Sequence, residues 1–241
     1  AVGDVNAAVT GLADAGVEEI VVWDNHAGSL NHDLTELSPA ASYRRGGTRN
    51  GLRWHGLHGG EEGFDGLILL GYHAKAGTLG GVLEHTMSSR EWFRLKVNGV
   101  ECGEMAIDGA LAGAVGVPVI LVSGCDKACA EAREVFGPDV VTVEVKKGYG
   151  RHGALCLPPE VTAKMLRQAA YEATGCLEKV QPVDLGSPAE IELTYKHTWL
   201  ADRANLTAFE GRRVDGYTCR WTAPDFPTWW GFTEANPPRT A

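Results

Sequence analysis

The stretch Gly66-Leu67-Ile68-Leu69-Leu70-Gly71 decides the fold class. A short, continuous apolar run between turn residues is typical of a strand in a parallel sheet that is buried on both faces. The patterns around it alternate, with helices near 3–15, 103–115 and 125–136 and strands at 18–23, 118–123 and 139–146. This rhythm predicts an α/β fold: a mainly parallel sheet flanked by helices.

The last third of the chain has a different pattern. Pro158-Pro159 begins a helix that runs to about Ala173, and alternating strands follow at Ala189–Tyr195 and around Val214–Trp221. These patterns predict a smaller C-terminal α+β portion over residues 156–241, after an α/β metal-site domain over 1–155. The proline-rich tail from Pro224, with Trp229-Trp230, is expected to be irregular or to cover a partner surface. A tail folded back on its own domain fits the pattern equally well.

Earlier in the chain, apolar and polar residues roughly alternate over Trp92–Val97, as in a strand. Asn98-Gly99 follows directly and is typical of a type I′ hairpin turn.

Composition excludes several classes of protein. The 241 residues carry 22 Lys and Arg against 31 Asp and Glu, a net charge of -9 without a basic block, so we expect no nucleic-acid partner. The apolar runs are too short to span a bilayer, and the start has no signal-peptide pattern. Six scattered cysteines resemble reduced cytosolic thiols and not a disulfide framework. We therefore expect a cytoplasmic protein that does not enter a membrane.

Three histidines and one glutamate form the candidate site. His26 and His73 each follow a predicted strand, where an open α/β sheet gathers its ligands. His85 lies in a short polar segment after Val82-Leu83, and Glu104 begins a predicted helix after the hairpin. Imidazole and carboxylate together suit a zinc-type hydrolytic site. The residues alone leave His85 open as a metal ligand, a general acid or base, or a hydrogen-bond donor.

Simpler explanations exist for each of these features. Any one histidine could be an ordinary loop residue, and the helix dipole alone would favour a carboxylate at Glu104. The segment from Gly71 to Gly81 could cradle a phosphate with Lys75, but its spacing fits neither common nucleotide-binding pattern. Cys125 and Cys129 lack the spacing of a redox or zinc motif and are expected to be buried thiols.

Several motifs in order resemble those of the zinc D-aminopeptidases. They are Asp24-Asn25-His26-Ala27-Gly28, Gly71-Tyr72-His73-Ala74-Lys75-Ala76-Gly77-Thr78, Gly81-Val82-Leu83-Glu84-His85-Thr86-Met87-Ser88 and Asn98-Gly99 with Gly103-Glu104. Val122-Ser123-Gly124-Cys125-Asp126 and the segment from Val145 to Arg151 agree as well. The resemblance covers roughly residues 5–222.

This resemblance implies a specific chemistry. It implies a two-zinc site in each subunit of the complete protein, with His26, His73 and Glu104 as metal ligands and His85 as a catalytic residue that does not bind metal. It further implies hydrolysis of short D-amino-acid peptides that have a free N-terminus. The expected assembly is a ring-like homo-oligomer such as a decamer.

One family motif is not found in its usual place. The remaining zinc ligands of the family come from Asp-x-Glu-Gly on a first strand, whereas this chain enters a helical pattern almost at once. We therefore expect that a first strand and loop are missing here. Two alternatives stay open: a metallohydrolase of another amide or ester, and a non-catalytic metal-binding or assembly protein.

Overall fold

The computed structural model describes residues 2–26, 30–45 and 63–235. In chain order, its elements are α1 (Val2–Asp14), β1 (Val21–Trp23), η1 (Leu34–Glu36), β2 (Ser42–Arg44), β3 (Leu67–Tyr72), β4 (Trp92–Val97), β5 (Val100–Cys102), α2 (Glu104–Gly113), β6 (Val119–Cys125), α3 (Asp126–Phe136), β7 (Val141–Gly150), β8 (Gly153–Cys156), α4 (Pro159–Ala173), η2 (Thr174–Cys176), β9 (Ala189–Tyr195), α5 (Thr198–Asp202), β10 (Arg212–Arg213), β11 (Thr218–Ala223) and α6 (Phe226–Ala235).

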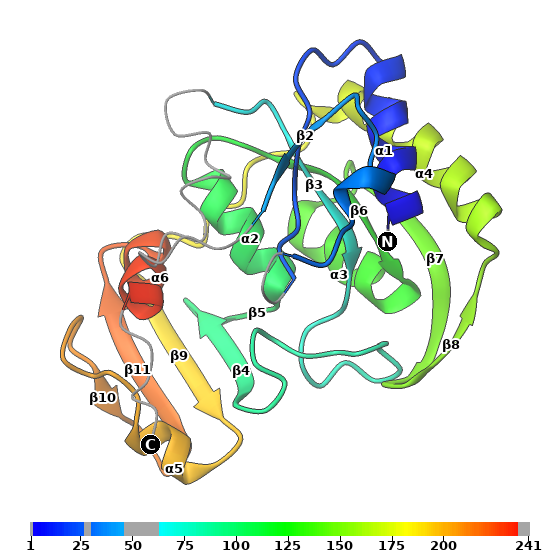
Figure 1. Cartoon of the computed structure of the whole chain (residues 1–241). Helices are drawn as coiled ribbons and strands as arrows, with labels where there is room; N and C mark the ends of the chain where they lie inside the picture. Colours follow the sequence, from blue (N-terminus) through cyan, green and yellow to red (C-terminus); the bar gives the residue numbers. More distant parts are fainter. Residues whose placement is uncertain (1, 27–29, 46–62, 236–241) are drawn as a thin grey trace.

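A four-stranded sheet forms the centre of the α/β part, in the order β3-β6-β7-β8. β3, β6 and β7 are parallel, and β8 adds an antiparallel edge. Every residue of β6 is buried, as its apolar sequence predicts. Helices α1 and α4 pack side by side against this sheet (Figure 1). They approach closely because α1 has Gly11 where a Cβ would lie 2.1 Å from the Arg167 carbonyl oxygen. The predicted fold class is confirmed.

A second, antiparallel sheet has the order β10-β11-β9-β4-β5. The β4–β5 hairpin turns at Asn98 and Gly99, whose φ angles of 49° and 81° confirm the type I′ signal. β4 pairs with β9, so this sheet takes strands from both sides of residue 155. The division of the chain into domains at that residue stays a prediction.

Helix α2 lies between the two sheets. Its residues Ile107 and Leu111 pack into the core of the antiparallel sheet, whereas Met105 packs with α3 and the parallel sheet. The first residue of α2, Glu104, therefore stands where the two layers meet. This placement lets the helix carry a functional side chain on a rigid, fully packed support.

The C-terminal tail differs from the expectation that it is irregular. Residues 226–235 form α6, and the side chains of Trp229 and Trp230 are buried in the core of the antiparallel sheet. The prolines of this segment obscured the helix in the sequence pattern. The helix tolerates Pro227 because that residue falls in its first turn, where a missing N–H costs nothing. Residues 226–235 therefore fold back on their own chain.

The segment after β1 also contains structure that the sequence did not suggest. β2 pairs in parallel with β1, and Ile20, the residue before β1, is buried beside Val5 and Val9 of α1.

All six cysteines are free, and Cys125 and Cys129 are buried, as expected. Among the described helices, none has the length and apolar character needed to cross a bilayer.

Candidate metal centre

Three of the four predicted site residues converge. His73 follows the end of β3 directly, His85 lies on the loop that leads towards β4, and Glu104 begins α2. One donor atom from each lies within 4.8 Å of the other two. All three side chains are only partly exposed. The residues form a compact group of nitrogen and oxygen donors at the carboxyl end of β3. The prediction that this strand is buried on both faces is wrong, because β3 lies at the edge of its sheet and only Leu69 in it is fully buried.

The distances within this group suit a small cation. Oε1 of Glu104 lies 3.5 Å from Nε2 of His73 and 3.4 Å from Nε2 of His85. Ligand atoms of a tetrahedral zinc ion, each about 2.1 Å from the metal, stand roughly 3.4 Å apart. The two imidazole rings stack with centroids 3.9 Å apart and an interplanar angle of 20°. The arrangement could hold one ion between two imidazoles and a carboxylate.

Backbone carbonyls determine which ring nitrogens are available. Nδ1 of His73 lies 3.1 Å from the carbonyl oxygen of Ala74, and Nδ1 of His85 lies 2.7 Å from that of Leu83. A carbonyl only accepts, so each neutral ring carries its proton on Nδ1. Each Nε2 then presents a lone pair towards Glu104. Hydrogen bonding of the second nitrogen to a carbonyl is the usual support of a metal-binding histidine.

Burial favours the metal-binding form of His73. Desolvation lowers the pKa of His73 from its usual value, and this outweighs the opposing effect of the Glu104 carboxylate. Because only a neutral imidazole can bind a metal, a lowered pKa keeps the ligand form populated at neutral pH.

Glu104 does more than complement the helix dipole. Its Oε1 accepts the backbone N–H of Met87 at 2.8 Å, so the carboxylate holds the loop that carries His85. Met87 adopts a φ of 58°, a conformation that costs energy for a side chain of this kind. The contact joins α2 to the His85 loop, which simple capping would not do.

A buried pair fixes the end of β3 against α2. The hydroxyl of Tyr72 donates a hydrogen bond to the carboxylate of Asp108, which lies one helical turn after Glu104 and is only 2% exposed. Burial and the Asp108 charge raise the pKa of Tyr72 well above its usual value, so the hydroxyl keeps its proton. The pair therefore fixes His73 and Glu104 relative to each other.

Sequence reasoning missed Glu131, which supports the loop from behind. This α3 carboxylate is 5% exposed, and its Oε2 accepts the backbone N–H of Lys75 at 2.7 Å. A Cβ at Gly103 would lie only 2.3 Å from its Oε1 and 2.7 Å from the Lys75 Cβ, so a larger residue beside Glu104 would displace this loop. Burial raises the pKa of Glu131 to about 7. A glutamate within a helix normally indicates a solvated face, so no local signal marked it.

Further hydrogen bonds close the segment between the two histidines. Thr86 Oγ1 accepts the N–H of Ala76 at 3.2 Å, and Glu84 Oε2 accepts that of Gly77 at 2.6 Å. Arg151 donates to the carbonyl oxygen of Glu84 and, at 2.8 Å, to its Oε1. These contacts hold His85 in place from both sides.

His26 lies outside this group. Its N–H donates to Oδ1 of Asp24 at 3.2 Å, and its carbonyl oxygen accepts from the Asn31 side chain at 2.7 Å. The residue is exposed, and within the described ranges the candidate metal cluster comprises only His73, His85 and Glu104. The role of His26 as a ligand stays a prediction.

Comparison with known proteins agrees with this geometry. The sequence profile of the D-aminopeptidase family, Peptidase_M55, matches residues 1–235. The chain belongs to the D-aminopeptidase family. It is 29% identical over 224 residues to a D-aminopeptidase from Bacillus subtilis (strain 168), covering 92% of this chain and 79% of that protein.

A solved structure of this family has the same fold. It is the Zn-dependent D-aminopeptidase DppA from Bacillus subtilis, described as a self-compartmentalizing protease. The TM-score is 0.85 at 26% sequence identity, over 100% of this chain and 87% of that one. The resemblance of the sequence motifs to this family is therefore confirmed. As a member of the family, the chain is an aminopeptidase.

Proposed function

We propose that this chain is a zinc-dependent aminopeptidase that hydrolyses short D-amino-acid peptides at a dinuclear zinc site. The observation that carries the proposal is the convergence of the Nε2 atoms of His73 and His85 on the Glu104 carboxylate. The Zn-dependence of the similar Bacillus subtilis enzyme supports zinc as the metal. We expect two zinc ions per subunit, with His26, His73 and Glu104 among the ligands.

The chain's own residues divide the remaining work. Zinc in such a site supplies an activated water and polarises the scissile carbonyl. His73 and Glu104 would hold the metal, and the Met87 N–H fixes the orientation of the carboxylate. His85 keeps its Nδ1 proton on the Leu83 carbonyl, which leaves Nε2 to carry a second proton to the leaving amine. We assign His85 as the catalytic acid on this basis.

The role of His85 is tested by His85→Ala. We expect this variant to lose turnover while it retains its zinc, measured by elemental analysis after dialysis. His197→Ala, which alters an exposed histidine, is the matched control and should keep both properties. Loss of zinc from His85→Ala would instead make His85 a ligand, which its distance to Glu104 also permits.

Stereochemistry and reaction class need a substrate panel. We expect cleavage of D-alanyl peptides with a free N-terminus and little cleavage of their L-forms or N-acetylated forms. Equal rates on L-peptides or on esters would favour a metallohydrolase of another amide or ester. Zinc binding without turnover of any member of the panel would favour a metal-binding or assembly protein.

We further propose that the chain forms a ring-like homo-oligomer, for which a decamer is the expected size, and that it acts in the cytoplasm. The self-compartmentalizing character of the similar structure supports the assembly. Analytical ultracentrifugation should give a mass several times that of the 25.8 kDa chain. A monomer at micromolar concentration would contradict this part of the proposal.

A further inference from the structure

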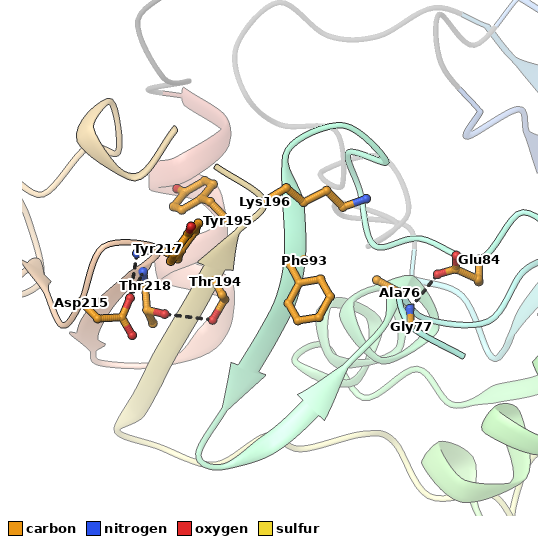
Figure 2. A pocket seen from close by; sticks show the side chains of 10 residues that line it. All are labelled: Ala76, Gly77, Glu84, Phe93, Thr194, Tyr195, Lys196, Asp215, Tyr217 and Thr218. Carbon is orange, nitrogen blue, oxygen red and sulfur yellow. Dashed lines mark hydrogen bonds between the residues drawn. The ribbon is translucent and has the colours of Figure 1, made fainter. Parts of the chain in front are cut away.

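A groove of about 560 Å³ lies between the metal-site loop and the antiparallel sheet (Figure 2). Ala76, Gly77 and Glu84 line one side. Residues of β4 and β9, Lys196 after β9, and the segment from Asp215 to the start of β11 line the other. Its volume is within the usual range for pockets that bind small ligands.

The first wall belongs to the loop that carries both histidines. Glu84 immediately precedes His85, and its Oε2 accepts the N–H of Gly77 at 2.6 Å. The N–H of His85 donates to the carbonyl oxygen of Ala74 at 3.3 Å. The groove therefore borders the loop that carries the metal centre, with Glu84 adjacent in sequence to His85.

Exposed aromatic side chains line the rest of the groove. Phe93 projects from β4 between the two walls, and Tyr217 stands on the far side (Figure 2). They are 44% and 49% exposed, which is high for aromatic residues. Aromatic faces of this kind contact small apolar side chains and peptide planes without demanding one sequence.

Among the described residues that line the groove, Lys196 is the one cation, and Glu84 and Asp215 are the carboxylates. The carboxylate of Glu84 is paired with Arg151, and that of Asp215 accepts the N–H groups of Tyr217 and Thr218. The Lys196 ammonium donates to the Ser89 carbonyl oxygen at 2.6 Å and forms no ion pair with any carboxylate in the described part of the chain. Lys196 thus offers a positive charge that is not paired with either carboxylate of the groove.

We propose that the groove binds the part of the substrate on the carboxyl side of the scissile bond, and that Lys196 pairs with the free C-terminal carboxylate of a short peptide. The proposal rests on the aminopeptidase function above, since an aminopeptidase holds the substrate's first residue at the metal. The groove that borders the metal-site loop can then receive the other end. A cationic amino terminus would be repelled beside Lys196.

The first test compares tri-D-alanine with its C-terminal amide. We expect wild-type protein to have the higher kcat/KM for the free acid. Lys196→Met should lower kcat/KM about fivefold for the acid and leave the amide nearly unchanged, since a partly exposed ion pair contributes about that much. Lys164→Met, on an exposed face of α4, is the matched control and should keep the wild-type ratio. An equal preference for acid and amide in active wild-type protein overturns the proposal.

A second measurement separates this proposal from the function itself. Calorimetric binding of the same two peptides to His85→Ala, with and without Lys196→Met, needs no turnover. Preference for the acid that disappears with Lys196→Met supports the groove even if wild-type protein cleaves no peptide. If neither peptide binds, the proposal is overturned. It is also overturned if Phe93→Glu dissociates the oligomer and leaves peptide binding unchanged. That result would show that the groove is a contact between subunits.

Discussion

Oε1 of Glu104 accepts the Met87 N–H at 2.8 Å while it lies 3.4 Å from Nε2 of His85. One carboxylate oxygen thus positions the loop that carries His85 and faces the ring of that same histidine. This relationship joins a rigid helix to a loop with strained residues on either side of His85, since Leu83 and Met87 both have positive φ angles. The site is held in shape before any ligand binds.

Glu104→Gln should weaken zinc binding by at least about tenfold, because the amide removes the negative charge while keeping an acceptor for the Met87 N–H. Titration with a competing chelator measures the affinity. Glu101→Gln, three residues earlier on β5, is the control and should bind zinc normally. Unchanged affinity in Glu104→Gln would remove Glu104 from the ligand set.

Arg151→Met should lower kcat by about tenfold or more without loss of zinc. The guanidinium holds the carbonyl oxygen and carboxylate of Glu84, so its removal lets the adjacent His85 shift, and small displacements of a catalytic group are costly. Steady-state kinetics and zinc content are measured together. Arg133→Met breaks a surface ion pair with Glu144 and should leave kcat unchanged. A KM effect alone would show that Arg151 does not position His85.

Glu131 should make folding stability depend on pH. Its pKa is raised from 4.5 to about 7 by burial, so the folded state binds the proton more tightly than the unfolded state. The stabilisation is complete below about pH 4.5, decreases as pH rises and is lost above about pH 7. Glu131→Gln cannot titrate, so wild-type protein should lose stability relative to it between pH 5 and 8 by on the order of 2 kcal/mol. Urea unfolding at several pH values checks this, and a constant difference would contradict it.

Trp229→Ala should destabilise the fold by about 3–5 kcal/mol, because it leaves a large cavity in the core. Trp229 is 1% exposed and packs against Trp221 and Phe226 of its own chain. Urea unfolding gives the free energy. Trp199→Ala is the control, since that ring is 51% exposed and its loss should cost little. A small effect at Trp229 would mean that the tail contributes little to this core.

The α/β pattern and part of the site could be predicted from local sequence. The apolar run at Leu67–Leu70 forms β3, and His73 therefore stands at the end of a parallel strand. Asn98-Gly99 forms its hairpin because few other residue pairs tolerate two positive φ angles. Such features depend on neighbouring residues only, so they are visible without the fold.

Other features could not be predicted in this way. β4 and β5 form a sheet with β9, β10 and β11 from the last third of the chain. No local sequence pattern indicates that β4 pairs with β9. Glu131 resembles any solvated helix residue until packing buries it behind Lys75. The helical tail with Trp229 was obscured by its prolines, although its burial needs only an apolar surface to cover.

Sequence by itself determined the βα order, the hairpin turn and which residue types were available for metal chemistry, because backbone preference and side-chain periodicity are local properties. Tertiary structure alone decided that His73, His85 and Glu104 meet, that carbonyls orient both imidazoles, and that Lys196 faces a groove beside them. Those relationships arise from packing two sheets around α2, where burial energy brings together residues that are distant in the chain.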